Sequence, residues 1–274
     1  MIVRSPPTRW SASSYELDLE HHGDFTVFYE IFVEGAYDPL LQYIRAGDCV
    51  IDAGANIGLF SLLAAARVGH QGIVLAVEPN PVNFGSLENH IVKNGIRNIR
   101  AFPYALSDVD GGEVWMGGQG IRAHILNEGE SALQSEGRYR VPTITLDELL
   151  RREDLAPRIL KMDIEGAERL ALTKARQMLE GVEAVAIEVH DPAGRTVVEE
   201  SFRDFGLTPF PSRGVGPYLR AMARHPYLMA KLELADHLMS LRRLLRDFGE
   251  VPVGDGGYPV MYLGHRRIPL TKRD

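Results

Sequence analysis

The sequence is short of cysteine and of long apolar runs, and both shortages exclude classes of protein. Cys49 is the single cysteine among 274 residues, so no disulfide can form within the chain. We expect this thiol to be buried in a strand, because a free cysteine usually packs as a small hydrophobic side chain. No apolar run is long enough to cross a bilayer, and residues 1–14 lack the apolar core of a signal peptide. The sequence therefore predicts a cytoplasmic protein without a membrane span.

Negative charge exceeds positive charge, but unevenly along the chain. The formal net charge is −7, and residues 213–274 hold 11 Lys or Arg against 6 Asp or Glu. The rest of the chain is therefore strongly acidic. This argues against nucleic acid as a partner, because phosphate binding needs a large basic surface. The basic C-terminal part keeps an RNA acceptor open as an alternative.

Apolar, β-branched runs alternate with helical patterns from residue 49 onward. Runs of this kind are buried on both faces, as in parallel sheets that helices cover. The repeated order predicts an α/β fold with a doubly wound sheet. The expected strands are 49–53, 73–78, 99–103, 159–164, 184–190 and 207–211, and the expected helices are 58–68, 81–94, 168–179 and 196–205.

Three segments depart from this alternation. Residues 1–46 precede the first core strand and predict an N-terminal cap, which leaves a main domain over 47–274. Residues 111–145 are rich in glycine and predict an insertion built from short strands. Residues 217–248 predict a helical insertion that carries several leucines. The cap and the helical insertion could each bury the interface of a homodimer. The short strands are expected at 113–116, 123–126 and 139–145, and a last strand at 260–267.

The most informative motif is a buried strand that runs into a glycine-rich turn and then a helix. Asp52 ends the strand and is expected to point into the crevice where open α/β sheets bind ligands. Gly54 has no Cβ, which would let a ligand approach the backbone. Asn56 tolerates a left-handed conformation, and Gly58 would permit close packing of helix against strand. The residues of this turn that we expect to bind a cofactor are Asp52, Gly54, Ala55, Asn56 and Gly58.

Glu78 ends the next expected strand, 26 positions after Asp52. In this topology its carboxylate would accept hydrogen bonds from the hydroxyls of a cofactor ribose. Pro79 stiffens the loop that follows, and Asn80 would border the adenine. The turn lacks the second and third glycines of the nicotinamide fingerprint, and an acid beside it suits the cationic amino acid end of S-adenosylmethionine better than a pyrophosphate. The predicted cofactor is S-adenosylmethionine, and a strand–helix turn without a ligand is the alternative.

Six motifs in this order resemble those of the FkbM family of class I methyltransferases, and the resemblance covers residues 45–212. They lie at 52–58, 78–80, 105–108, 145–149, 161–168 and 188–190. The resemblance implies a Rossmann-like, seven-stranded, mostly parallel sheet with helices on both faces. It also implies O-methylation of a hydroxyl group on a small molecule, a sugar or a glycan. Residues 28–38 resemble the family's lead-in to the first strand. The side chains that we assign to the substrate are Glu30, Tyr37 and Glu188.

Three side chains at the crevice ends of neighbouring strands are the candidates for catalysis. A neutral imidazole could accept the proton of a substrate hydroxyl as the methyl group leaves sulfur. His190 is therefore the preferred general base, with Asp163 or Glu165 as alternatives. Asp163 could also hold the methionine amino group. Glu168 is expected only to start a helix, because acidic side chains are stabilised in a first helical turn.

The loop after the third expected strand should reach the adenine of the cofactor. Leu106 would pack on the ring, and Ser107 or Asp108 would bond to its exocyclic amine. A plain turn built from serine and aspartate is the alternative.

A divalent metal is the open alternative for the carboxylates of the crevice. Carboxylate oxygens and an imidazole nitrogen could together bind Mg²⁺ or another ion, but no tight ligand spacing demands it, and we expect no metal. The prediction is thus an O-methyltransferase that uses S-adenosylmethionine alone. An RNA methyltransferase and a non-catalytic module that binds the cofactor or a partner protein remain alternatives. The residues that could bind such a metal are Asp163, Glu165, Glu188 and His190.

Overall fold

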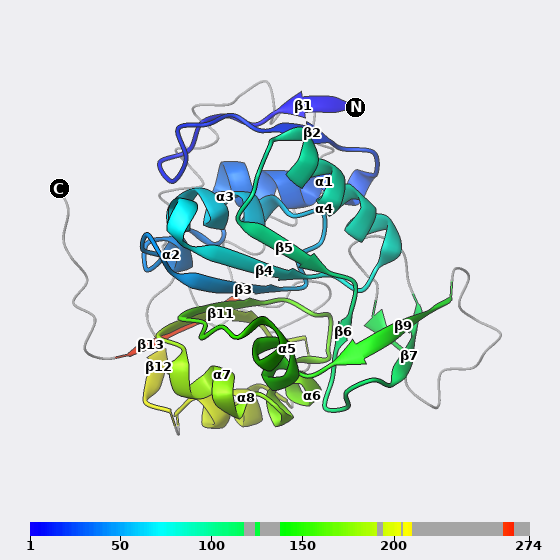
Figure 1. The fold of residues 1–274 in the computed structure, drawn as a ribbon, viewed down its shortest axis with the longest axis vertical. Helices are drawn as coiled ribbons and strands as arrows, with labels where there is room; N and C mark the ends of the chain where they lie inside the picture. Colours follow the sequence, from blue (N-terminus) through cyan, green and yellow to red (C-terminus); the bar gives the residue numbers. More distant parts are fainter. Residues whose placement is uncertain (118–123, 127–137, 191–193, 204, 210–259, 266–274) are drawn as a thin grey trace, which may run out of the picture.

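The computed structural model describes a central, mostly parallel sheet (Figure 1). The described residues are 1–117, 124–126, 138–190, 194–203, 205–209 and 260–265. Within them the strand order of this sheet is β12-β13-β11-β10-β3-β4-β5. The strands from β11 to β5 are parallel, and β13 runs antiparallel to both of its neighbours. The bounds are β3 Cys49–Ala53, β4 Ile73–Val77, β5 Ile99–Phe102, β10 Ile159–Met162, β11 Ala184–Glu188, β12 Leu207–Pro209 and β13 Val260–His265.

Helices cover both faces of this sheet, which confirms the predicted α/β class. One core cluster joins the sheet to α3 and α4, and a second cluster joins its other face to α5, α6, α7 and α8. Every residue of β3, β10 and β11 is buried, as expected of strands covered on both sides. Cys49 is buried at the start of β3, as predicted. The bounds are α3 Leu59–Val68, α4 Pro81–Lys93, α5 Leu146–Glu153, α6 Glu168–Thr173, α7 Arg176–Gly181 and α8 Gly194–Arg203, with a short 3-10 helix η2 at Gly69–Gln71.

The single helix expected over residues 168–179 is wrong, because the chain forms α6 and α7 with a break at Lys174–Ala175. The side chain of Asp147, at the start of α5, accepts hydrogen bonds from the backbone N–H groups of Arg176 and Gln177 at 3.0 and 2.8 Å. These N–H groups would otherwise lack partners at the start of a helix. The side chain of Asp147, from α5, therefore caps the start of α7 and separates it from α6.

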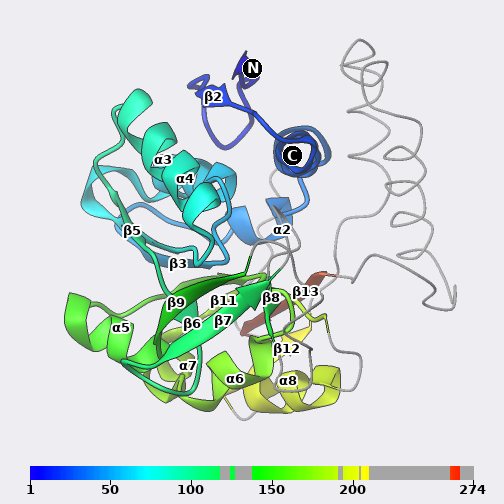
Figure 2. The ribbon, with the colours of Figure 1, turned by 90° about the vertical axis from the view of Figure 1, so that its right-hand side faces the viewer.

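A second sheet lies on the side of the central sheet where β5 ends, and Figure 2 shows it in front. Its order is β6-β9-β7-β8. Three of its strands correspond to the short strands expected in the glycine-rich insertion. The bounds are β6 Ala105–Leu106, β7 Glu113–Gly117, β8 His124–Ile125 and β9 Tyr139–Ile144.

The first 46 residues pack on α3 and α4. His90 of α4 is fully buried and accepts a hydrogen bond from the backbone N–H of Asp18 at 2.8 Å. The core of this segment is continuous with that of α3. Its role as a cap stays a prediction, and the helical insertion expected at 217–248 lies outside the described residues. The bounds are β1 Ile2–Arg4, β2 Glu16–Asp18, α1 His22–Phe28, the π-helix η1 Tyr29–Glu34 and α2 Asp38–Leu41.

Over the described ranges, no helix combines the length and the apolar character that a membrane crossing requires.

Candidate active site

The turn after β3 is tied to the end of β4. The backbone N–H groups of Gly54 and Ala55 both donate to the carbonyl of Val77 at 2.9 Å. Asn56 has a φ of 53°, which confirms the predicted left-handed conformation. The turn therefore sits at the carboxyl edge of the sheet, where ligands of open α/β sheets bind.

Packing within the chain requires both glycines of this turn, and at Gly58 the neighbour differs from the expected one. A Cβ on Gly54 would lie 1.8 Å from the carbonyl oxygen of Asp163, so the backbone that follows β10 leaves no room for a side chain there. The approach of a ligand to Gly54 stays a prediction. A Cβ on Gly58 would lie 2.4 Å from Cδ1 of Leu87, so this glycine permits the approach of helix α4 and not of a strand. Both residues have positive φ angles, 75° and 86°, which favour glycine.

Glu78 directly follows β4, and its side chain accepts hydrogen bonds from the turn after β3 and from the loop after β4. Its Oε2 accepts a hydrogen bond from the N–H of Asn56 at 2.8 Å, and its Oε1 accepts one from the N–H of Asn80 at 2.9 Å. Burial raises the pKa of Glu78 to about 7, although these two N–H groups favour the ionised form. The side chain of Asn80 accepts from the N–H of Val82 and caps α4. Its predicted place beside the adenine, and that of Pro79, stay predictions.

Asp52 does not point into an open crevice, and the expectation that it does is wrong. Its side chain has no exposed surface, accepts a hydrogen bond from Oγ of Ser61 at 2.6 Å, and lies 3.3 Å from Nζ of Lys161. Lys161, in β10, is itself 4% exposed. A buried ammonium needs a carboxylate partner, and Asp52 is that partner.

Lys161 is a site residue that the sequence analysis missed. Its Nζ donates to the carbonyl of Gly54 at 2.6 Å and lies 4.0 Å from a carboxylate oxygen of Asp163. Burial alone would lower the pKa of Lys161, but the charges of Asp52 and Asp163 outweigh burial and raise it. The signal was present, because a lysine inside a strand expected to be buried on both faces requires a buried partner.

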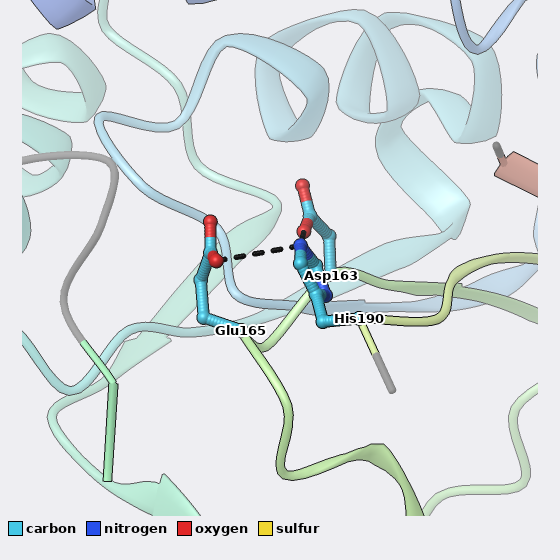
Figure 3. A group of neighbouring side chains, drawn as sticks. All are labelled: Asp163, Glu165 and His190. Atoms are coloured by element: carbon cyan, nitrogen blue, oxygen red, sulfur yellow. Dashed lines mark ion pairs between the residues drawn. The ribbon is translucent and has the colours of Figure 1, made fainter. Parts of the chain in front are cut away.

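The structure brings the three predicted catalytic residues together (Figure 3). Asp163 directly follows β10, Glu165 lies in the next turn, and His190 follows β11. Nε2 of His190 lies 3.3 Å from Oε2 of Glu165 and 3.7 Å from Oδ1 of Asp163. The carboxylates are about one third exposed, and the imidazole is mostly buried. A ligand can therefore reach the cluster from solvent.

Glu168 does more than start α6. Its Oε1 lies 2.9 Å from Nδ1 of His190 and accepts a hydrogen bond from the N–H of Gly166 at 3.0 Å. Its side chain is 2% exposed. This buried carboxylate fixes the ring of His190 so that Nε2 faces Asp163 and Glu165.

The carboxylates control the charge of the imidazole. Burial lowers the pKa of His190, but the hydrogen bond with Glu168 and the charges of Glu165 and Asp163 raise it to about 9. Burial raises the pKa of Glu165 to about 7. The charged imidazole is therefore the main form at neutral pH in the ligand-free chain, and the neutral form expected of a general base is the minor one.

Tyr37 connects the N-terminal segment to the cluster. Its hydroxyl donates to Oδ2 of Asp163 at 3.4 Å, and its ring packs edge-on against Phe60. Glu30 lies in η1, and Glu188 ends β11 with 7% exposure. The assignment of these three residues to the substrate stays a prediction.

Two residues of the predicted adenine loop, Leu106 and Ser107, are buried, and Asp108 is half-buried. Leu106 packs in the core with Val77 and Ile144, and Oγ of Ser107 donates to Asp108 at 3.2 Å. Their contacts with a cofactor stay predictions. A further residue that the sequence analysis missed is Tyr139 of β9, whose pKa is raised to about 12, first by burial and then by the charge of Glu78. The second sheet thus reaches the side of the site where Glu78 lies.

The chain matches a known sequence family. The sequence model described as "Methyltransferase FkbM domain" matches residues 52–233. Hexuronic acid methyltransferase AglP of Haloferax volcanii is 29% identical over 153 residues, which cover 55% of this chain and 59% of that protein. The 31-O-demethyl-FK506 methyltransferase FkbM of Streptomyces tacrolimicus is 37% identical over 86 residues, which cover 31% of this chain and 32% of that protein. The chain thus spans less than two thirds of either relative.

A solved structure is also similar. Methyltransferase FkbM from Methylobacillus flagellatus KT superposes with a TM-score of 0.43 at 16% identity, over 71% of this chain and 52% of that chain.

Proposed function

The chain belongs to the FkbM methyltransferase family, and from that premise we propose that it transfers a methyl group from S-adenosylmethionine to a hydroxyl oxygen of a small molecule or a glycan. Two relatives support this acceptor class by their names. One is named for a hexuronic acid, and the other for an O-demethylated compound.

The observation that carries the proposal is the buried carboxylate of Glu78 beside the turn after β3. A carboxylate oxygen can accept two hydrogen bonds, and Oε2 accepts one from the N–H of Asn56. The ribose hydroxyls of the cofactor would donate to the remaining positions. Residues Gly54 to Gly58 would border the cofactor, and Asn80, Leu106, Ser107 and Asp108 would enclose the adenine.

The cluster of Asp163, Glu165 and His190 would face the reacting groups. Adjacent strands lie about 4.8 Å apart, so Asp163 and Glu78, which follow strands two places apart, are separated by about 10 Å along the sheet edge. A nucleoside that carries a methionine chain can span such a distance. The carboxylates favour its cationic end.

S-adenosylmethionine supplies an electrophilic methyl group on a cationic sulfur. The side chains of the chain orient the acceptor hydroxyl in line with that group, which lowers the barrier by fixing the geometry. As the bond from carbon to oxygen forms, the bond from carbon to sulfur would break, and S-adenosylhomocysteine would leave. The hydroxyl proton would pass to Asp163 or Glu165, or to His190 when its imidazole is neutral, while Tyr37, Glu30 and Glu188 would border the acceptor.

The proposal also covers the domain organisation and the oligomeric state of the chain. The seven strands of the described sheet would be the complete sheet of a domain over 47–274, with residues 1–46 as a cap. A homodimer through the cap or through residues 217–248 stays a prediction.

Two measurements test the proposed function. Calorimetry with S-adenosylhomocysteine should show binding to the wild type, at least tenfold weaker binding to Glu78→Ala, and unchanged binding to the control Glu88→Ala, whose side chain is exposed on α4. Label from methyl-tritiated S-adenosylmethionine should then appear on the hydroxyl groups of a panel of uronic acids, neutral sugars and macrolides.

Two results would contradict the proposal. Absence of cofactor binding by the wild type would remove its basis. Label found on RNA, and not on any hydroxyl compound, would support the RNA alternative instead.

A further inference from the structure

We propose that Asp163, Glu165 and His190 bind one divalent transition-metal ion through one carboxylate oxygen each and through Nε2 of the imidazole. The sequence alone did not favour a metal here, and the geometry of the folded cluster does. Metal binding itself is independent of the proposed function, and only the role of the ion rests on it.

The distances within the cluster suit a single ion. One ligand atom from each of the three residues lies within 4.8 Å of the other two. Nε2 lies 3.3 Å from Oε2 of Glu165 and 3.7 Å from Oδ1 of Asp163. Ligands at about 2.1 Å from an ion lie about 3.0–3.4 Å from one another. Small rotations of two partly exposed carboxylates would therefore complete the coordination.

Glu168 provides a second observation, because it lies behind the imidazole and outside the ligand set. Its carboxylate is 2% exposed and contacts Nδ1 of His190 at 2.9 Å. Histidines that bind metals almost always donate their other ring N–H to a carboxylate, a carbonyl or a water, which fixes the ring and its tautomer. Glu168 does this for a ring whose Nε2 already points at two carboxylates (Figure 3).

The charges of the cluster also call for a cation. Asp163, Glu165 and Glu168 surround a single imidazole. The nearby ammonium of Lys161 lies closer to Asp52, at 3.3 Å, than to Asp163, at 4.0 Å. Carboxylates packed this closely repel one another unless positive charge separates them. A protonated imidazole supplies one positive charge against three carboxylates. A divalent ion between Asp163 and Glu165 would displace the proton on Nε2 and supply two.

The ligand set indicates which ion binds. Mg²⁺ and Ca²⁺ prefer oxygen ligands alone, whereas an imidazole nitrogen suits transition metals and carboxylates suit Mn²⁺. One nitrogen with two carboxylates therefore favours Mn²⁺ or Zn²⁺. Three protein ligands leave positions open, as in catalytic metal sites.

The open positions give the ion a role in the proposed reaction. A hydroxyl group that binds a metal ion loses its proton more readily. With Asp163, Glu165 and His190 bound to the ion, the acceptor oxygen would release its proton to solvent water and not to these side chains. The freed electron pair would form the bond to the methyl carbon. The electron pair of the broken carbon–sulfur bond would stay on the sulfur of S-adenosylhomocysteine.

Calorimetry with MnCl₂ and with ZnCl₂, on the full chain stripped with a chelator and without cofactor, tests the site. We expect one ion per chain in the wild type and at least tenfold weaker binding in Asp163→Asn and Glu165→Gln. Glu168→Gln should weaken binding about 10- to 100-fold while leaving all three ligands in place. The control Glu180→Gln, on the exposed side of α7, should bind as the wild type does.

The site is overturned if the wild type binds neither ion at millimolar concentration, which would mean that the imidazole alone bridges the carboxylates. Equal binding by the wild type and the three site variants would also overturn it, because the ion would then sit elsewhere. Circular dichroism confirms that each variant is folded. Binding of S-adenosylhomocysteine to the same metal-free samples separates this outcome from a failure of the proposed function.

Discussion

Gly54 shows at the level of one residue why the turn after β3 keeps its shape. Its φ of 75° favours glycine, and a Cβ there would lie 1.8 Å from the carbonyl oxygen of Asp163. We predict that Gly54→Ala displaces the turn, lowers the free energy of unfolding by about 3 kcal/mol or more, and abolishes binding of S-adenosylhomocysteine.

The chain contains a matched control for this substitution. Gly85 lies within α4, where a Cβ would meet nothing within 4 Å. Gly85→Ala should stabilise the chain by about 0.5–1 kcal/mol, because alanine favours a helix interior. Urea unfolding and calorimetry measure both variants. If Gly54→Ala were as stable as the wild type, the close approach of the two backbones would be wrong.

The raised pKa of Glu78 should make the free energy of unfolding depend on pH. Its pKa is raised by burial to about 7 in the folded chain, above the value of 4.5 for an unperturbed glutamate, while Lys161 and Tyr139 face it and titrate far above this range. A raised pKa favours the protonated form in the fold, so the stability that this group contributes is complete below pH 4.5 and is lost as the pH rises through 7. We expect a loss on the order of 3 kcal/mol.

Comparison with Glu78→Gln isolates this effect, because the other titrating groups are common to both proteins. The free energy of unfolding of the wild type, minus that of Glu78→Gln, should fall between pH 5 and pH 8 by on the order of 3 kcal/mol. Denaturant titrations across this range give the difference. A difference that does not change with pH would show that Glu78 is ionised throughout.

The roles of single residues divide into those that the sequence could predict and those that it could not. Asn56 tolerates positive φ because of its own side chain, and its conformation was predicted correctly. The burial of Asp52 depends on Lys161, which lies 109 positions further along the sequence. Such a pairing is determined by strand order, so the residue types alone could not predict it.

At the level of elements, the expected strands of the central sheet begin where the observed ones begin, whereas one helix was missed and another is broken in two. The expected strand at 49–53 matches β3, and those at 73–78 and 99–103 end one residue beyond β4 and β5. Strands buried on both faces are continuous apolar runs, which the sequence displays directly. Helix α5 was not predicted, although Thr145 accepts a hydrogen bond from the N–H of Glu148 and these two residue types at this spacing are typical of a helix start.

The break between α6 and α7 was not predictable from local sequence, because the capping residue lies in another helix. Substitution of that residue tests its role. Asp147 accepts hydrogen bonds from the N–H groups of Arg176 and Gln177. We predict that Asp147→Ala lowers the free energy of unfolding by about 1–2 kcal/mol, because it removes the cap of α7.

Asp147→Asn serves as the graded control, because it keeps one acceptor oxygen and should lose less than half as much stability. Thermal unfolding measures both variants. Equal stability of Asp147→Ala and the wild type would mean that α7 begins without this cap.

At the level of the whole molecule, the side chain of His90 connects the N-terminal segment to the turn after β3. His90 of α4 is fully buried. Its Nε2 accepts a hydrogen bond from the N–H of Asp18 in β2 at 2.8 Å, and its Nδ1 donates to the carbonyl of Ile57 at 2.8 Å. The segment, the helix and the turn are therefore coupled.

Removal of this link tests the coupling. We predict that His90→Leu lowers the free energy of unfolding by about 2–4 kcal/mol, because it leaves two polar backbone groups without partners. Val92→Ala, at a position of α4 that is 78% exposed, should change it by less than about 0.5 kcal/mol. Protease cleavage within residues 1–46 should be faster in His90→Leu only. Equal cleavage rates in both variants would show that the segment is held by other contacts.

The central claim is that one crevice holds the adenosyl group at Glu78 and the reacting end at Asp163, Glu165 and His190. A crystal structure of the chain with S-adenosylhomocysteine tests this claim most directly. The account predicts ribose hydroxyls at about 2.7 Å from the carboxylate of Glu78 and a sulfur that faces the three-residue cluster. A nucleoside bound away from Glu78, or a sulfur turned away from the cluster, would contradict it.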